Sequence, residues 1–136
     1  MERYTITIQK ELLERFDESI AKKGYNNRSE ALRDLVRDSL VKEEWAGDKE
    51  QVAATVTLIY EHHIPDLADK LTDLQHHHGN LVVASIHIHL DNHNCMEVVI
   101  LRGRCKDVRR LAEKMISIRG VKHGKIAHTT EGGKIS

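Results

Sequence analysis

Two histidines and one cysteine near the middle of the chain are the residues best suited to bind a metal ion. His87 and His89 lie two positions apart in an alternating apolar segment, and side chains spaced in this way on a strand leave the same face about 7 Å apart. Cys95 begins the next apolar segment. Because imidazole nitrogen and thiolate sulfur hold nickel, copper or zinc tightly, the sequence predicts a transition-metal site made of His87, His89 and Cys95.

The side to which Cys95 points depends on the turn that precedes it. Residues 81–90 and 95–101 are predicted to form a β-hairpin, because the polar segment 91–94 between them is rich in turn-forming residues. A loop with an odd number of residues places Cys95 on the face of His89, and an even number turns it away. The hairpin offers no fourth donor. Glu97 is a candidate to accept the second N–H of a ligating imidazole.

The other histidines and the second cysteine carry a weaker signal. The chain has 10 histidines, and an isolated histidine is usually an ordinary surface residue. We therefore expect the remaining ones to be mostly exposed, with His62 and His78 as sites of adventitious metal binding; this group comprises His62, His63, His77, His78, His93, His123 and His128. Cys105 has no companion at ligand spacing, so we expect it to be a small core residue.

Composition excludes several classes of protein. The 136 residues carry 21 basic and 21 acidic side chains, so the overall charge does not point to an anionic partner. The longest apolar run, Leu81 to Ile86, is too short to cross a bilayer, and the first residues lack a secretory apolar segment. The sequence therefore predicts a cytoplasmic protein without membrane association. An enzyme is also not expected, since no activated nucleophile, acid–base pair or phosphate-binding glycine loop is evident.

The second half of the chain has the pattern of a small α+β domain. Alternating or apolar segments predict strands at 52–62, 81–90, 95–101 and 121–129. Helical spacing of apolar residues predicts helices that follow Pro65 and Cys105 and end near 78 and 119. The resulting order, βαββαβ, is that of a ferredoxin-like (ACT-like) domain.

The first 45 residues predict one strand and two helices. In Arg3–Ile8 the residues Tyr4, Ile6 and Ile8 alternate with Arg3, Thr5 and Thr7, which indicates a half-buried strand. Helices are predicted from Lys10 to Lys22 and after Asn27, whose side chain can cap the helix together with Glu30. A unit of this size buries too little apolar surface to fold alone. We therefore expect the strand to pair with its copy in a second chain.

This arrangement, with Asn-Arg-Ser-Glu-Ala opening the second helix, resembles the ribbon-helix-helix repressors. In that family the paired strands enter the major groove of DNA. The resemblance implies that Arg3, Thr5 and Thr7 read base edges and that Arg28 and Ser29 hold phosphate. Residues 1–45 contain nine Lys or Arg and ten Asp or Glu, so DNA affinity would depend on a local positive patch. Its candidates are Lys22, Lys23, Arg28 and Arg33.

The domain boundary is predicted where charge is dense and apolar periodicity stops. We expect a DNA-binding domain at 1–45, a linker at 46–51 and a metal-binding domain at 52–136. Trp45 has the size to pack against either domain, and the sequence leaves the choice open.

The segment QHHHGNLVVASIHIHLDNHNC resembles the NikR family of nickel-responsive regulators, and the similarity extends from Arg3 to about Gly124. The resemblance implies a square-planar site of His87, His89 and Cys95 with His76 from a neighbouring subunit, although His76, His77 and His78 are hard to tell apart. It further implies one Ni²⁺ per subunit and a homotetramer built as a dimer of dimers. A further cation site is implied at Glu30 and Asp34, two carboxylates that are more often simple surface charges.

The resemblance implies a repressor of nickel-uptake genes that binds a palindromic operator in double-stranded DNA more tightly with Ni(II). The residues alone leave two alternatives open. The chain could store or deliver a metal with the same ligands, or it could be a metal-independent ribbon-helix-helix repressor with structural histidines. The ligand types also accept copper and zinc, so nickel is specified by the resemblance.

Overall fold

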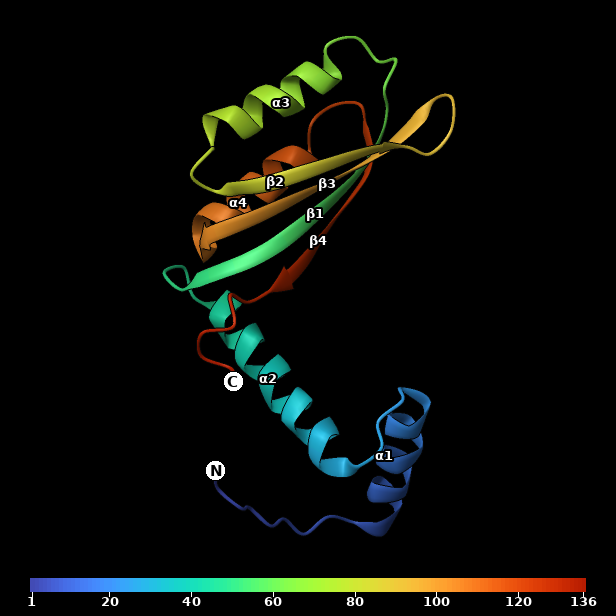
Figure 1. Ribbon diagram of the computed structural model, residues 1–136, viewed down its shortest axis with the longest axis vertical. Helices are drawn as coiled ribbons and strands as arrows, with labels where there is room; N and C mark the ends of the chain where they lie inside the picture. The colour runs from blue at the N-terminus through green and yellow to red at the C-terminus, as the bar shows by residue number, and fades with distance from the viewer. The chain divides into compact units, whose positions relative to one another are not determined.

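The computed structural model describes residues 1–136, and its contacts divide the chain into two units, Met1–Ser39 and Leu40–Ser136. The first unit holds helix α1 (Lys10–Lys22) and most of helix α2 (Arg28–Ala46) (Figure 1). The last turns of α2 belong to the second unit. The helix continues through the charged residues 42–44, so only residues 47–50 separate α2 from the first strand of the second unit.

Two local interactions set the turn between α1 and α2. Gly24 follows α1 with a φ of 88°, a conformation that glycine adopts without strain, and the amide of Tyr25 donates to the carbonyl of Ile20 at 3.0 Å. The amide of Glu30 then donates to the Asn27 side chain at 3.0 Å. Half of the predicted capping box is therefore present, while the Glu30 carboxylate pairs with Arg33 instead.

The predicted strand at Arg3–Ile8 is not formed within the single chain. Residues 1–9 belong to no helix or strand, and Tyr4, Ile6 and Ile8 are 89%, 54% and 37% exposed. The physical reason is that a lone strand has no partner for its backbone N–H and C=O groups. In the first unit only Ile20 and Ala31 are buried, so its apolar faces are uncovered in one chain.

The second unit is a four-stranded antiparallel sheet with two helices. Its elements are β1 (Gln51–Glu61), α3 (Leu67–His77), β2 (Val82–His89), β3 (Asn94–Arg104), α4 (Cys105–Ile116) and β4 (Val121–Thr129). The strand order is β2-β3-β1-β4, which places β2 and β4 at the edges. The predicted βαββαβ order and ferredoxin-like class are confirmed.

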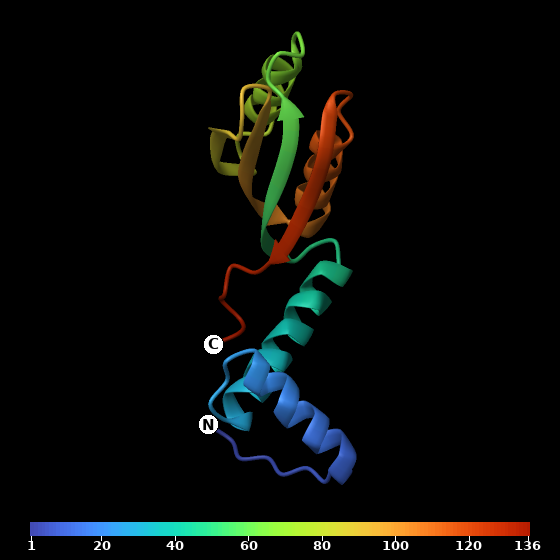
Figure 2. The ribbon, with the colours of Figure 1, turned by 90° about the vertical axis from the view of Figure 1, so that its right-hand side faces the viewer.

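Both helices cover the same side of this sheet (Figure 2). Every second residue of β1 from Val52 to Tyr60 is buried, as are Cys95, Val99 and Leu101 of β3. They form one core with Leu67 and Leu71 of α3 and with the apolar stripe of α4, which consists of Val108, Leu111, Ala112 and Met115. Buried residues recur at every second position in the strands and at every third or fourth position in α4, as the sequence pattern predicts.

Trp45 joins the end of α2 to the second unit. It is 7% exposed, and its indole Nε1 donates to the carbonyl of Thr129 at 2.8 Å. The Arg109 guanidinium of α4 donates to the Trp45 carbonyl, one of the last acceptors of the helix, which has no partner within it. The buried Cys105 thiol also faces this carbonyl at 3.5 Å. Trp45 therefore packs on the core of the second unit, and Cys105 is a core residue as expected.

No helix of the structure has the length and apolar character that crossing a membrane requires.

Candidate metal centre and DNA-contacting residues

The β2–β3 hairpin brings His87, His89 and Cys95 to one face of the sheet. In its register His89 lies opposite Cys95 and His87 opposite Glu97. Five residues, 90–94, separate His89 from Cys95, so the loop has the odd length that keeps the two side chains on the same face. Paired residues on adjacent antiparallel strands have Cβ atoms about 4.5–5.5 Å apart, which is within reach of a shared ion.

Aromatic rings gather on this face beside the hairpin. The imidazole centroids of His87 and His89 are 5.4 Å apart, and the Tyr60 ring of β1 stacks on His87 with a centroid distance of 6.0 Å. Tyr60 is also the β1 partner of Cys95. Cys95 therefore lies between Tyr60 on one neighbouring strand and His89 on the other, and all of these side chains point to the helix-covered side.

The thiol of Cys95 is engaged within the chain. Its Sγ donates to the backbone carbonyl of Tyr60 at 3.3 Å, and its side chain is fully buried. Burial raises the pKa of the Cys95 thiol, and the interaction with the Tyr60 side chain only partly opposes this effect. Within residues 1–136 no group of three or more His, Cys, Asp or Glu side chains is arranged to hold a metal ion. The donor types fit a transition metal, provided that the thiol turns from the Tyr60 carbonyl towards His89.

Glu97 is the one buried charged residue of the sheet. The Tyr60 hydroxyl donates to its Oε1 at 2.7 Å, and the Gln75 amide of α3 donates to its Oε2 at 2.5 Å. Burial, followed by the bond to Glu97, raises the pKa of Tyr60. Both carboxylate oxygens are therefore used by groups other than the imidazoles. Sequence reasoning singled out Glu97 but missed Gln75 and Tyr60 as its partners, because their meeting depends on how α3 packs.

A hollow of about 470 Å³ lies between the end of α3 and the β2 edge, and His76, Gln75, His87 and Glu97 are among its lining residues. The three consecutive histidines differ in their contacts. His77 Nδ1 is 2.7 Å from the Asp73 carbonyl and His78 Nδ1 is 3.0 Å from the Leu74 carbonyl. The exposed His76 ring makes no hydrogen bond within the chain, so it is free to reach a ligand outside.

Asp91 holds the hairpin turn in place. Its Oδ1 accepts the amide hydrogens of His93 at 2.8 Å and Asn94 at 2.7 Å. These backbone bonds lower the pKa of Asp91 to about 2. The turn is thereby fixed immediately before Cys95, which supports the register that aligns this residue with His89.

Most of the histidines expected to be solvated are exposed, but His62 packs among other imidazoles at this end of the sheet. The His62 ring lies 4.5 Å from His89 and 4.2 Å from His63 between centroids. His62 Nδ1 is buried without a hydrogen-bond partner, and burial is the main cause that lowers the pKa of His62. His63 is 3.1 Å from the Asn92 carbonyl. Of the group, His62 departs most from an ordinary surface residue.

The residues expected to contact DNA fall on two segments of the first unit. Arg3, Thr5 and Thr7 lie in the exposed N-terminal segment, and Arg28 and Ser29 open α2. Arg28 forms a two-bond ion pair with Asp17 of α1, with both distances at 2.8 Å. Ser29 is exposed. The unpaired backbone amides of the first turn of α2 therefore lie beside an arginine whose side chain is held in position by Asp17.

The two carboxylates expected at a further cation site are each paired within the chain. Glu30 binds Arg33. Asp34 accepts the Tyr25 hydroxyl at 2.5 Å and the Arg37 guanidinium at 2.6 Å. The bonds from Tyr25 and then Arg37 lower the pKa of Asp34. A cation at this position would have to compete with two arginines and a tyrosine.

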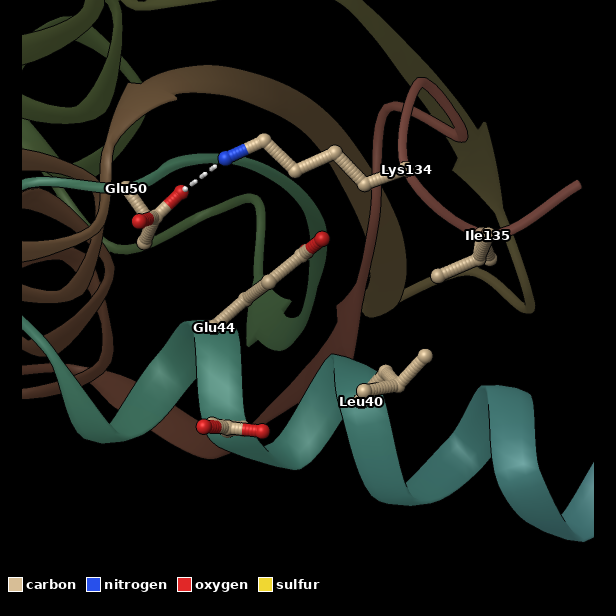
Figure 3. A pocket seen from close by; sticks show the side chains of 6 residues that line it. Leu40, Glu44, Glu50, Lys134 and Ile135 are labelled. Atoms are coloured by element: carbon tan, nitrogen blue, oxygen red, sulfur yellow. Dashed lines mark hydrogen bonds and ion pairs between the residues drawn. The ribbon is translucent and has the colours of Figure 1, made fainter.

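A second hollow, of about 200 Å³, separates the end of α2 from the C-terminal tail (Figure 3). Lys134 reaches across it to Glu50 at 3.1 Å, and Leu40 and Ile135 form its apolar wall. Thr130 adds a bond of 3.4 Å to Glu44. The Thr130 contact ties the tail to α2, and the Lys134 contact ties it to the segment that follows this helix.

Comparison with known proteins identifies both parts of the chain. The family described as "NikR C terminal nickel binding domain" matches residues 53–129, and "Ribbon-helix-helix protein, copG family" matches residues 2–43. Among solved structures, an uncharacterized protein from Thermotoga maritima has a TM-score of 0.52 and 15% identity, covering 58% of this chain and 98% of that one. At this identity, the last likeness supports the fold alone.

Full-length relatives carry both parts in the same order. A protein of Geobacter metallireducens is 50% identical over 133 residues, covering 98% of this chain and 96% of the relative. A protein of Pyrococcus furiosus is 48% identical with the same coverage, and one of Thermococcus kodakarensis is 50% identical over 134 residues, again with 98% and 96% coverage. Each is named "Putative nickel-responsive regulator". The chain therefore belongs to the NikR family, in which a ribbon-helix-helix module precedes a nickel-binding domain of ferredoxin-like fold.

Proposed function

We propose that this protein is a cytoplasmic transcriptional repressor of nickel-uptake genes whose operator binding is strengthened by Ni²⁺. The observation that carries this proposal is the pairing of His89 with Cys95 across β2 and β3, with His87 on the same face. That pairing supplies two imidazoles and one thiol, a donor set that suits nickel. Family membership supplies the DNA-binding module on the same chain.

The proposed ligands are His87, His89 and Cys95 of one chain and His76 of the partner subunit, with one ion per subunit. Of the three histidines at the end of α3, His76 is the one with no hydrogen bond inside its own chain. It lines the same hollow as His87, so ligands of one chain and a donor for the next lie on one surface. When bound, the metal would join the two subunits through these donors.

The exposed edge of the sheet supports an assembly of this kind. Along β2 and its turn, Val83, Ile86, Ile88 and Leu90 are 56%, 58%, 47% and 49% exposed. Soluble proteins seldom leave a long apolar edge strand open, because it can pair with other chains. We propose that a second copy of the chain covers this edge, since the proposed metal centre takes its His76 ligand from another chain. Together with pairing through the N-terminal segment, this gives a tetramer made of two dimers.

The N-terminal segment supports DNA binding through a paired ribbon. Tyr4, Ile6 and Ile8 alternate with Arg3, Thr5 and Thr7, so pairing with a second copy would bury one set and present the other to the major groove. A ribbon made from two identical chains has twofold symmetry, and the matching operator is a palindrome. Arg28, Ser29 and the first amides of α2 are proposed to hold flanking phosphates.

Metal and DNA binding would be coupled through the assembly. Nickel fixes how two ribbon dimers are held relative to one another, and this geometry selects operators of matching spacing. Such coupling is typically about 1–3 kcal/mol, which corresponds to roughly 5- to 150-fold in DNA affinity. The coupling is reciprocal, so operator DNA should tighten nickel binding by the same factor.

The test combines a spectroscopic metal titration with DNA binding. Ni²⁺ is added to the full-length protein, its His87→Ala and Cys95→Ala variants, and His93→Ala as a control for an exposed histidine in the neighbouring turn. We expect a thiolate-to-nickel band in the wild type and in His93→Ala, and none in Cys95→Ala. The same band in Cys95→Ala would refute the ligand set.

Operator binding is measured on duplexes selected from a random library in the presence of nickel. Wild-type affinity is expected to rise at least fivefold from metal-free protein to nickel-loaded protein. Thr5→Ala/Thr7→Ala is expected to bind nickel normally and to lose selective DNA binding. A protein that binds nickel but selects no sequence would instead be a storage or delivery protein, and selection unaffected by chelator would indicate a metal-independent repressor. Copper and zinc titrations show whether the site prefers nickel.

The further cation site at Glu30 and Asp34 is proposed as a secondary feature. The two carboxylates are spaced one helical turn apart on α2. A cation that binds there replaces Arg33 and Arg37 as their partners. Calorimetric titration with Mg²⁺ and K⁺ in the presence of DNA, comparing wild type with Glu30→Gln, tests it. Identical heats from the two proteins would remove this site from the proposal.

A further inference from the structure

The arginine at the start of α2 forms a side-on ion pair with an aspartate of α1. Arg28 Nε lies 2.8 Å from Asp17 Oδ1, and Arg28 Nη2 lies 2.8 Å from Asp17 Oδ2. Both residues belong to the first unit and are eleven positions apart. The pair lowers the pKa of Asp17 and raises that of Arg28, in each case mainly through the hydrogen bond between them. Both groups are therefore charged at neutral pH.

This geometry leaves one edge of the guanidinium free. A guanidinium has five N–H groups in a planar fork, and the pair with Asp17 uses the Nε hydrogen and one Nη2 hydrogen. The two Nη1 hydrogens and the second Nη2 hydrogen remain. They form the end-on edge, which matches the two oxygens of a phosphate. Arg28 can therefore hold a phosphate without releasing Asp17.

The contribution of the pair to folding is small. Its side chains are 55% and 40% exposed, and ion pairs with this exposure usually add little to stability. What the pair does fix is the direction of a long, flexible side chain. It also cancels the charge of Arg28 at a place where the first 45 residues already carry ten acidic and nine basic side chains.

We propose that Asp17 is a positioning residue for DNA recognition, which aims the free edge of Arg28 at one operator phosphate and suppresses binding to DNA that does not fit. The inference rests on the proposed function, since it takes Arg28 as a phosphate contact. Two consequences of removing the carboxylate oppose each other. Loss of orientation weakens the operator complex, whereas loss of a negative charge strengthens non-specific binding.

The experiment measures the affinities of nickel-loaded full-length protein for a selected operator and for a random duplex at fixed salt. In Asp17→Asn, operator affinity is expected to fall several-fold and random-duplex affinity to rise, so that the specificity ratio drops about tenfold, a change typical of one or two lost charged hydrogen bonds. Asp17→Glu keeps the charge but moves it by one methylene, and should recover the low random-duplex affinity without full operator affinity.

Glu18→Gln is the matched control. Glu18 lies next to Asp17 on α1 and is exposed, and its side chain forms no hydrogen bond or ion pair in the chain. Its replacement changes the net charge by the same amount, so both affinities should rise by a similar factor and the ratio should stay constant. If Asp17→Asn behaves as Glu18→Gln does, the positioning role is refuted and only a general charge effect remains.

Arg28→Gln separates this inference from the proposed function. It should weaken operator binding and reduce the salt dependence by about 0.9 in log K against log salt, the value for one lost phosphate contact. Adding Asp17→Asn to it should have no further effect on the ratio, because the two residues act as one unit. If Arg28→Gln leaves operator binding unchanged, the DNA contact itself is wrong. If it weakens binding while Asp17→Asn leaves the ratio intact, only the positioning role fails.

Discussion

The Gln75 amide of α3 donates to the Glu97 carboxylate of β3 at 2.5 Å, directly beside the proposed ligand His76. Glu97 in turn lies opposite His87 in the hairpin register. One buried carboxylate therefore connects the helix end that carries His76 with the hairpin that carries His87. The two halves of the proposed metal centre, which serve different subunits, are linked inside each chain by this hydrogen bond.

Replacing Glu97 with glutamine should therefore weaken nickel binding although no ligand is removed. A glutamine at this position presents an N–H₂ group to donors that need an acceptor, so the bonds from Tyr60 and Gln75 cannot both persist. Loss of an interaction that orients ligands typically lowers metal affinity by about 10- to 100-fold. Competition with a metal-binding dye measures this affinity. Glu113→Gln, on the exposed side of α4, is the control and should bind as the wild type does. Equal affinities for the two variants would show that Glu97 has no role in orienting the ligands.

The sequence predicted most of the hairpin because its information is local. Alternation placed His87 and His89 on one face, and the turn residues predicted the hairpin. The side taken by Cys95 stayed open in the sequence, and the structure shows it opposite His89. The sequence could not predict that Gln75 and Tyr60 bind Glu97, since these contacts depend on the packing of α3 and β1 against β3. The contact between the His62 and His89 rings likewise depends on packing between segments distant in the sequence.

Two further differences have physical reasons in the first 50 residues. The expected strand at 3–8 requires the backbone of a second chain, so a single chain cannot display it. Apolar periodicity ends near Leu40, yet α2 continues to Ala46, because Lys and Glu at 42–44 are good helix formers that need no apolar neighbours. Trp45 is then held by Thr129 and Arg109, partners more than sixty positions away that no local pattern reveals.

Trp45 should be a major contributor to the stability of the second unit. Trp45→Ala is expected to lower the free energy of unfolding by about 3–5 kcal/mol, the usual cost of removing a buried large aromatic side chain. Trp45→Phe keeps most of the apolar volume and loses mainly the hydrogen bond to Thr129, so its cost should be about 1 kcal/mol. Urea unfolding followed by circular dichroism measures both, with the exposed Lys49→Ala as control. Similar losses for the alanine and phenylalanine variants would show that burial is not the main contribution.

The turn between α1 and α2 should lose stability in acid. The Tyr25 hydroxyl and then Arg37 hold the pKa of Asp34 below its ordinary value of 3.8. A carboxyl with a lowered pKa in the folded state contributes stability above its unfolded pKa and loses it as pH falls through the folded pKa. The stability advantage of the wild type over Asp34→Asn should therefore be constant from pH 5 to 8 and shrink below about pH 4. Thermal unfolding at each pH measures it. A difference that stays constant down to pH 2 would mean that the charged form of Asp34 is not favoured by folding.

The open apolar stripe of α2 should be the surface through which two chains associate. Leu35 and Val36 are 51% and 59% exposed in one chain, although they belong to the stripe that a paired ribbon-helix-helix unit would cover. Leu35→Glu places a charge there, and burial of an unpaired carboxylate is costly enough to prevent association. Sedimentation velocity should show a smaller species than the wild type. Selective DNA binding should also be lost, because the ribbon that enters the major groove needs a strand from each of two chains. Asp38→Glu, on the same helix but outside the stripe, should leave both unchanged. The second unit does not include Leu35, so the circular dichroism signal of that unit should persist in Leu35→Glu. An unchanged sedimentation coefficient in this variant would place the dimer contact elsewhere.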